Sequence, residues 1–358
     1  MKKFIALLLV AVMCLGMVAC GKQEAAAPAA TAPATTAAPA ATTTAPAAPA
    51  GPEYDEVTLQ IAHVNAVDNA CHLAYEKLAE YCKEKSEGKV QIDIYPAGQL
   101  YNQDDSYDAC MLGDLDMCQA DLSGMTAKAP KAGVLSLAML MPSYEKAAKV
   151  FYGEIGDKVN AEIESAYGYH VMGWMWNGFR VMVTNDPIDE LADCKGYKLR
   201  VPAIDLYLNV FVPMGFTPIT TTWGECYSSC QSGLCDGCET TVQAVYQQGF
   251  AELCGNVTKT NHILSVIGPC MNIDKWNSLS ADTQQLITDG WAEAQQWAND
   301  QVTGQEDGFY ENMIAEGTNV MDWKNPQELV DLFTPMWAEN AKNGGFEDLL
   351  AEAQAALK

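Results

Sequence analysis

The stretch VTLQIAHVNAVDNACHLAYEKLAEYCKEKSEGKVQIDIY, residues 57–95, decides the fold of this chain. Its start, 57–63, alternates in polarity and is rich in β-branched residues, which predicts a strand. Residues 69–86 place their apolar side chains on one helical face and are followed by Gly88, which predicts a helix that ends there. Residues 90–95 predict a second strand. The stretch is therefore a strand–helix–strand unit.

The same alternation continues toward the C-terminus. Residues 104–112 predict a short helix that ends at Gly113, and residues 116–120 predict a third strand. A strand–helix–strand–helix–strand order is typical of a mostly parallel sheet with helices on its faces. The first part of the chain is therefore predicted to be an α/β unit.

A second α/β region follows, and long helices close the chain. The pattern predicts strands over 169–176 and 179–184, split by Asn177-Gly178, strands over 198–201 and 216–220, and helices over 206–214, 222–232, 281–316, 327–343 and 346–357. Two α/β units suggest two lobes, and ligands of open α/β sheets bind beyond the carboxyl ends of the strands. We therefore expect a two-lobed, periplasmic-binding-protein-like α/β fold with a ligand cleft between the lobes and long C-terminal helices.

The N-terminus reads as an export signal. Lys2 and Lys3 precede an apolar run over 4–12, which predicts a signal peptide over 1–19. Cys20-Gly21 resembles a bacterial lipobox, in which the cysteine is lipidated, although Met17 stands where such motifs usually carry leucine. The alternative is an ordinary signal peptide cut elsewhere.

Residues 20–52 are predicted to be a tether that starts at the lipidated cysteine. From Ala25 onward the segment is almost only Ala, Pro and Thr, which cannot bury enough apolar surface to offset its ordering entropy. A glycosylated or recognition segment is the alternative. The mature protein is therefore expected outside the cytoplasm, anchored to the membrane by lipid.

The charge of the chain restricts its partners. The formal net charge is −25, which disfavours nucleic acid and anionic lipid surfaces and gives no long-range attraction to an anionic ligand. An anion must therefore be held by locally placed arginines. The sequence contains two, Arg180 and Arg200. No later segment offers eighteen apolar residues without charge, so no membrane span is expected in the mature chain.

The cysteines allow an alternative hypothesis about function. The chain has 13 of them, and the spacing Cys226-x3-Cys230-x4-Cys235-x2-Cys238 suggests a metal site or a redox pair. Cys226 and Cys230 lie one helical turn apart rather than on loops, which favours buried free thiols that act as small apolar side chains. The sequence also lacks GxSxG, GxGxxG, Walker A and HExxH motifs. We therefore expect no enzyme activity, no cofactor and no metal.

A series of short motifs resembles the solute-binding proteins of tripartite ATP-independent periplasmic (TRAP) transporters, of the C4-dicarboxylate-binding type. The residues 195–202, KGYKLRVP, are similar to the family segment KGLKIRVP. The other motifs keep the family's order; they are residues 95–100 (YPAGQL), 112–117 (LGDLDM), 176–180 (WNGFR), 231–239 (QSGLCDGCE) and 260–262 (TNH). The resemblance extends over about 57–279.

The resemblance implies that Arg200 pairs with a ligand carboxylate. A planar guanidinium matches a carboxylate in two parallel hydrogen bonds and stays charged at any relevant pH. Arg180 matches a second arginine near the ligand, with a structural salt bridge as its rival role. Further ligand contacts are implied for six residues, namely Asn65, Asp121, Trp176, Trp223, Glu239 and Thr240. Thr240 stands where the family commonly has asparagine, so the identity of the ligand cannot be carried over.

The resemblance implies capture of an organic acid anion outside the cytoplasm and its delivery to TRAP membrane subunits. The expected lobes are residues 53–177 with about 266–305, and residues 178–265 with about 306–358. The ligand remains open among sugar acids, dicarboxylates, keto acids and aromatic acids. The alternatives are a ligand-sensing lipoprotein that reports to a membrane receptor and a thiol oxidoreductase that uses Cys235 and Cys238.

Overall fold

The computed structural model describes residues 51–358, which form one compact unit. The predicted signal peptide 1–19, the lipidated Cys20 and all but the end of the tether 20–52 lie outside the described residues. Within 51–358, no helix combines the length and the apolar character that a membrane span needs.

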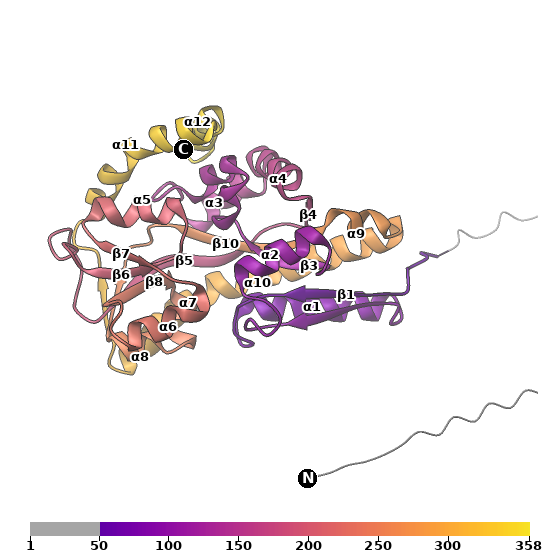
Figure 1. Ribbon diagram of the computed structural model, residues 1–358, viewed down its shortest axis with the longest axis horizontal. Coiled ribbons are helices and arrows are strands. Elements are labelled where there is room, and N and C mark those ends of the chain that lie inside the picture. The colour runs from indigo at the N-terminus through magenta and orange to yellow at the C-terminus, as the bar shows by residue number, and fades with distance from the viewer. Residues whose placement is uncertain (1–50) are drawn as a thin grey trace, which may run out of the picture. The chain divides into compact units, whose positions relative to one another are not determined.

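Eleven strands form one mixed sheet in the described part of the chain (Figure 1). The main path runs in the order β2-β1-β3-β10-β5-β8-β6-β7, and β4, β9 and β11 are attached to its side. The strands are β1 (Val57–Ala62), β2 (Val90–Tyr95), β3 (Met117–Asp121), β4 (Tyr169–Val171), β5 (Met175–Thr184), β6 (Lys198–Val201), β7 (Thr217–Thr220), β8 (Gly237–Thr241), β9 (Asn256–Lys259), β10 (Leu264–Asn272) and β11 (Asn319–Asp322).

Helices surround this sheet. They are α1 (Ala70–Lys85), α2 (Gln103–Leu112), α3 (Tyr144–Phe151), α4 (Glu154–Tyr167), α5 (Asp205–Met214), α6 (Trp223–Gln231), α7 (Val242–Gln247), α8 (Phe250–Cys254), α9 (Ile273–Ser278), α10 (Ala281–Ala315), α11 (Pro326–Gly344) and α12 (Glu347–Ala356), with short 3-10 helices η1 (Gly124–Ala127) and η2 (Pro130–Ser136). Their starts follow ordinary capping chemistry: the Asn69 side chain accepts from the backbone N–H of Cys71 at the start of α1.

The sheet has two parallel sections joined by antiparallel strands. β2, β1 and β3 are parallel, and so are β8, β6 and β7. β10 and β5 lie between these sections and run antiparallel to their neighbours. The α/β fold is therefore as predicted, whereas the expectation of a mostly parallel sheet holds only for the two outer sections.

β5 runs straight through the predicted break at Asn177-Gly178. Its first half pairs with β10 and its second half with β8 and β9. A register shift opposite Ser265 and Val266, with Gly178 at a φ of 113°, accommodates the extra residue as a bulge. The prediction of two strands was therefore wrong, because Asn-Gly here forms a bulge rather than a turn.

Four apolar clusters fill the two faces of the two sections. Helices α1 and α10 cover one face of the β1–β3 section, and helices α2, α3, α4 and α12 cover the other. Around β6 and β8, α5 and α11 pack on one face, and α6, α7 and α8 on the other. The 35-residue α10 contributes to three of these clusters, so it connects both sections.

The C-terminal helix α12 packs beside the β1–β3 section. Residues 306–358 were predicted to belong to the second lobe, but Phe346, Leu350 and Leu357 lie in the apolar cluster with α3 and α4, beside the β1–β3 section. The turn at Gly345, which has a φ of 67°, ends α11 and directs α12 to that side. The other lobe boundaries stay predictions.

Candidate functional site

Four of the predicted ligand residues lie at or just beyond the carboxyl ends of parallel strands. Asn65 follows β1, and Asp121 ends β3. Arg200 and Thr240 lie in the last two residues of β6 and β8. In open α/β sheets, this edge is where ligands bind. The two sections of the sheet thus each present polar side chains at the edge that the fold class reserves for a ligand.

Arg200 is a buried guanidinium without an acidic partner. Its side chain is 2% exposed, Nε donates to Oγ1 of Thr221 at 3.2 Å, and Nη2 donates to the carbonyl of Thr221 at 2.5 Å. Among residues 51–358, Nη1 has no hydrogen-bond partner and no carboxylate forms an ion pair with this arginine. A buried cation is costly unless an anion compensates it. Arg200 therefore has the chemistry of an anion-binding group.

Trp223 lies over Arg200. The centre of its ring is 5.9 Å from the guanidinium carbon, within cation–π range, and the ring also packs on Phe250. Trp223 is the first residue of α6, which a capping box of Thr222 and Glu225 fixes in place. The structure thus brings together Arg200 and Trp223, two residues that the family resemblance predicted to contact the ligand.

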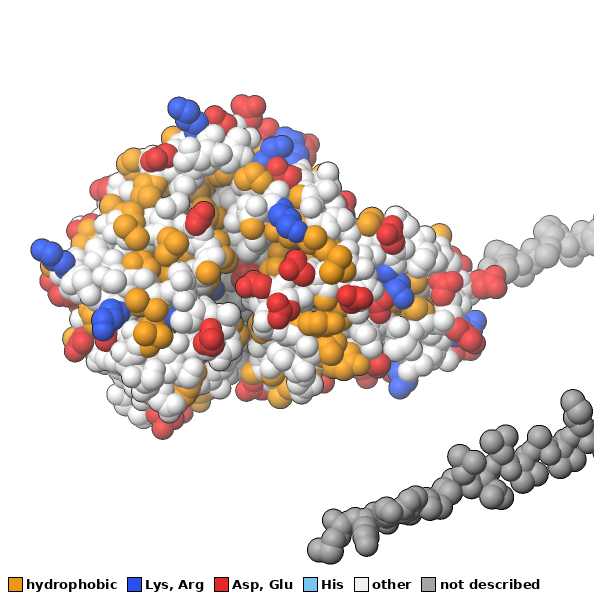
Figure 2. Space-filling view, viewed as in Figure 1, with side chains coloured by type: hydrophobic (Ala, Val, Ile, Leu, Met, Phe, Trp, Pro, Cys, Tyr) orange, Lys and Arg blue, Asp and Glu red, His pale blue; other side chains and the backbone are white. Residues whose placement is uncertain are grey.

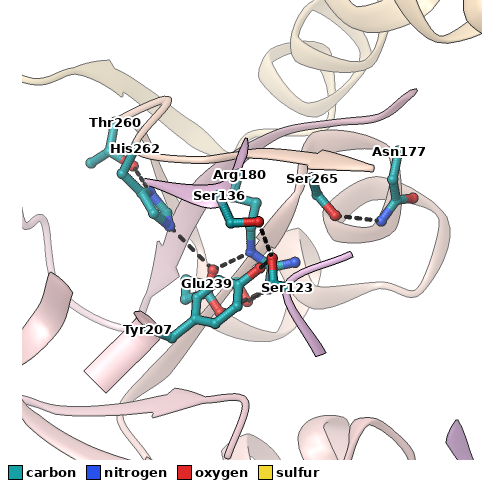
Figure 3. A network of polar contacts seen from close by, with 9 residues as sticks. All are labelled: Ser123, Ser136, Asn177, Arg180, Tyr207, Glu239, Thr260, His262 and Ser265. Carbon is teal, nitrogen blue, oxygen red and sulfur yellow. Dashed lines mark hydrogen bonds and ion pairs between the residues drawn. The ribbon is translucent and has the colours of Figure 1, made fainter. Parts of the chain in front are cut away.

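Arg180 is held in a different way, by a fully buried carboxylate (Figure 3). Its Nε donates to Oε2 of Glu239 at 2.5 Å and its Nη2 donates to Oε1 at 2.7 Å, with 3.1 Å to the Glu239 carbonyl. Burial acts to raise the pKa of Glu239, but the Arg180 guanidinium and His262 outweigh it and lower the pKa to about 2. Glu239 is therefore ionised at neutral pH and neutralises Arg180.

His262 completes this network. Its Nε2 lies 3.2 Å from Oε2 of Glu239, and its Nδ1 lies 2.7 Å from Oγ1 of Thr260. Burial lowers the pKa of His262 despite the adjacent carboxylate. A neutral ring that donates from Nε2 to Glu239 and accepts the Thr260 hydroxyl at Nδ1 satisfies both contacts.

Residues from both sections of the sheet meet around Arg180. Its guanidinium carbon lies 4.8 Å from the ring centre of Tyr207 in α5, and its charge partly offsets the effect of burial, which raises the pKa of Asp121. Ser123, which follows β3, lies 3.4 Å from the Tyr207 hydroxyl. The carboxyl ends of β3 and β8 therefore converge on Arg180, whose structural ion pair is the rival role foreseen for it.

Asn65 belongs to a separate polar network at the end of β1. Its Nδ2 donates to Oδ1 of Asn69, and its Oδ1 accepts from Nε2 of Gln119 at 3.1 Å. Its backbone N–H donates to Nδ1 of His63, a ring whose pKa burial lowers to about 3. Asn65 is thus held in one orientation, although both of its amide atoms already have protein partners.

Trp176 and Thr240 lie in packed surroundings. The Trp176 ring is 4% exposed and contacts the rings of Tyr144, Phe151 and Tyr152, with centre separations of 5.9, 5.3 and 5.3 Å. This environment favours a packing role over the predicted ligand contact. Thr240 is 3% exposed and pairs with Val181 in the sheet.

Three polar residues after Thr240 were not among the predicted ligand contacts. Thr241, Gln243 and Gln247 each have a buried side-chain oxygen without a hydrogen-bond partner among the described residues. Within residues 51–358, seven buried side-chain nitrogen or oxygen atoms lack a hydrogen-bond partner. These three oxygens and Nη1 of Arg200 are four of them, and the four lie at the ends of β6 and β8 or in α7. Buried polar atoms are normally paired. These residues could have been found in the sequence because they are polar and directly follow a strand.

The surface is hollowed beside these strand ends. Figure 2 shows a depression between the part that contains α5, α6 and α7 and the part that contains α2, with Asp and Glu side chains gathered over α2. A hydrogen bond from Nε2 of Gln247 to the carbonyl of Asp68 links α7 to the loop before α1, so the two parts touch there. Because the acidic side chains at this rim repel an anion, only a nearby arginine can attract it into the depression.

The two cysteines proposed for redox chemistry are fully buried. Cys235 and Cys238 are both 0% exposed. Burial raises the pKa of Cys235 to about 11 and that of Cys238 well above its ordinary range. Because the thiolate is the nucleophile in thiol exchange, these surroundings disfavour a thiol oxidoreductase.

Comparison with protein families gives one match over most of the chain. The family model described as "Bacterial extracellular solute-binding protein, family 7" matches residues 61–343. A solute-binding protein from Roseobacter denitrificans is 29% identical over 244 residues, which are 68% of this chain and 74% of that protein. A C4-dicarboxylate-binding periplasmic protein from Rhodobacter capsulatus is 26% identical over 312 residues, 85% of this chain and 92% of that protein.

A solved structure shares the fold. A TRAP periplasmic solute-binding protein from Bradyrhizobium, in complex with galacturonate, aligns with a TM-score of 0.79 and 25% identity over 84% of this chain and 100% of that one. Other similar proteins are named or were solved as binding proteins for succinate, L-gulonate and sialic acid. These ligands all carry a carboxylate.

Proposed function

Because the chain belongs to the family 7 bacterial extracellular solute-binding proteins, the binding proteins of TRAP transporters, we propose that it captures an organic carboxylate at the Arg200 edge of its sheet. Sugar acids and C4-dicarboxylates are the classes that its relatives favour. Transport, not catalysis, is the role of this family.

The observation that carries the proposal is Nη1 of Arg200, which has no hydrogen-bond partner among residues 51–358. Thr221 holds the guanidinium through Nε and Nη2, so its orientation is set before a ligand arrives. An incoming carboxylate finds a fixed charge with an unused donor, and Trp223 covers the other side of the pair. Because the donor is preorganised and desolvated, little ordering entropy is lost on binding.

Polar groups around Arg200 recognise the rest of the ligand. Arg180 already has its counter-ion in Glu239, so it contributes rigidity and a local dipole more than a net charge. Thr240, Thr241 and Gln243 offer hydroxyl and amide groups to the hydroxyls of a sugar acid, and Asn65 and Asp121 supply polar groups from the other section. Closure around the ligand by hinge motion of two lobes is the mechanism we infer.

Delivery of the ligand requires partners outside this chain. We infer that the ligand-bound protein docks on TRAP membrane subunits and works outside the cytoplasm, as its periplasmic relatives do.

The lipid anchor at Cys20 is a further part of the proposal. A Cys20→Ser variant, expressed in a bacterial host that processes lipoproteins, is expected to move from the membrane fraction to the soluble fraction. Fractionation and detergent phase partitioning measure this. Equal membrane association of both proteins would refute the anchor.

A carboxylate library tests the function. Thermal unfolding of the purified protein is expected to shift upward with an acid that it binds, since a ligand at 100 times its Kd stabilises by about 2.7 kcal/mol. Matched amides and alcohols of the same skeleton serve as controls that lack the charge. Silence across sugar acids, dicarboxylates, keto acids and aromatic acids, or equal shifts with the uncharged controls, would count against carboxylate capture.

A further inference from the structure

Three cysteine thiols converge behind Arg200. The Sγ atoms of Cys226, Cys230 and Cys238 all lie within 4.8 Å of one another. Cys226 and Cys230 stand one turn apart on α6, and Cys238 faces them from β8. The three side chains are 0%, 7% and 0% exposed. The helix spacing that favoured simple packing in the sequence therefore aims two thiols at a third.

The spacing of the three sulfur atoms suits a shared metal ion. A zinc–thiolate bond is about 2.3 Å long, so sulfurs that coordinate one ion lie about 4 Å apart, a small adjustment from the observed positions. All eleven cysteines among the described residues are free thiols, so no disulfide occupies this group. Cys254, the last residue of α8, lies in the same apolar cluster but outside this group of three converging sulfurs.

The side chains around the three cysteines favour a thiophilic metal ion over a hard cation. The cluster is lined by apolar side chains such as Val183 and Val245, which exclude the oxygen ligands that hard cations require. Three thiolates on a divalent ion leave one net negative charge, and Arg200 pairs with Cys238 in the adjacent strand, so a positive side chain lies close by. The slight exposure of Cys230 gives an entry point from the surface.

We propose that Cys226, Cys230 and Cys238 form a binding site for a thiophilic metal ion of the Zn2+ or Cu+ class. Each thiol that coordinates the ion releases its proton to solvent. The ion fastens α6 to β8, and so holds the helix that carries Trp223 against the strand beside Arg200. The proposed carboxylate capture itself needs no metal, and the ion adds only a fixed position for Trp223 beside Arg200.

Cd2+ is a suitable probe because its bonds to thiolates absorb in the ultraviolet. The reduced protein is titrated with Cd2+ in oxygen-free buffer, and the bound metal is counted by native mass spectrometry. We expect a charge-transfer band that saturates at one ion per chain and disappears when Zn2+ is added in excess. The band is expected to be lost in Cys226→Ala and Cys238→Ala. It should persist in Cys194→Ala, the matched control, which removes a buried thiol from another apolar cluster.

Any of three results would overturn the site. The first is the absence of a thiolate band from the wild-type protein. This result needs no variant, so it does not depend on whether a variant folds. The second is a band of equal intensity in the Cys226 and Cys238 variants, and the third is an equal loss of the band in the Cys194 control. Circular dichroism before the titration identifies any variant that has lost its fold.

Discussion

Arg200→Ala is expected to weaken binding of the carboxylate by about 2 to 5 kcal/mol, the loss typical when one partner of a buried, hydrogen-bonded charge pair is removed. The acid then enters a site whose only unpaired guanidinium among the described residues is gone, and its charge is left uncompensated. Isothermal titration calorimetry with the acid found in the library measures this change directly.

Two controls separate binding from folding. Arg200→Lys keeps the charge but loses the fork geometry, so it should bind with an affinity between wild type and alanine. The ligand-free Arg200→Ala protein should unfold at no lower denaturant concentration than wild type, because it loses an unpaired buried charge rather than an ion pair. Unchanged affinity in a folded Arg200→Ala protein would remove Arg200 from the site.

Glu239→Gln is expected to lower the free energy of unfolding by about 3 to 5 kcal/mol, the range for breaking a buried ion pair by removing one partner. The substitution leaves the Arg180 guanidinium, which is 5% exposed, without its counter-ion, and it also disturbs the contact with His262. Urea unfolding followed by tryptophan fluorescence gives the difference.

The exposed pair of Lys158 and Glu352 supplies the matched control. Their side chains are 47% and 43% exposed, so Glu352→Gln should leave the unfolding curve unchanged. The double variant Arg180→Met with Glu239→Gln should recover part of the loss, because it removes the stranded charge. If Glu239→Gln were as stable as wild type, the buried Arg180–Glu239 pair would make no measurable contribution to stability.

Local sequence patterns were enough to predict most helices and strands. They failed where the structure depends on pairing between strands that are far apart in the sequence. The helix over 281–316 and the strands of the first α/β unit were predicted within a residue or two, since periodicity and capping are local properties. β10, which runs through the middle of the sheet, was not predicted: it is buried along its whole length and has no alternation to detect. Asn177-Gly178 looked like a turn because its partner, β10, is distant in sequence.

The same division applies to the site. The prediction that Arg200 binds the ligand came from a sequence resemblance, and a guanidinium is chemically suited to bind an anion. In the described part of the chain, Arg200 has no acidic partner because strand register decides which arginine a carboxylate reaches. Glu239 lies opposite Met182 and its side chain faces Arg180 rather than Arg200. The convergence of Cys226 and Cys230 on Cys238 likewise required the placement of α6 on β8.

The crystal structure of the protein with its preferred acid tests the central claim most directly. We expect a carboxylate oxygen of the ligand about 2.7–2.9 Å from Nη1 of Arg200, with Trp223 over the pair and Arg180 still bound to Glu239. A carboxylate that displaces Glu239 from Arg180, or an acid bound away from the carboxyl end of β6, would contradict the account.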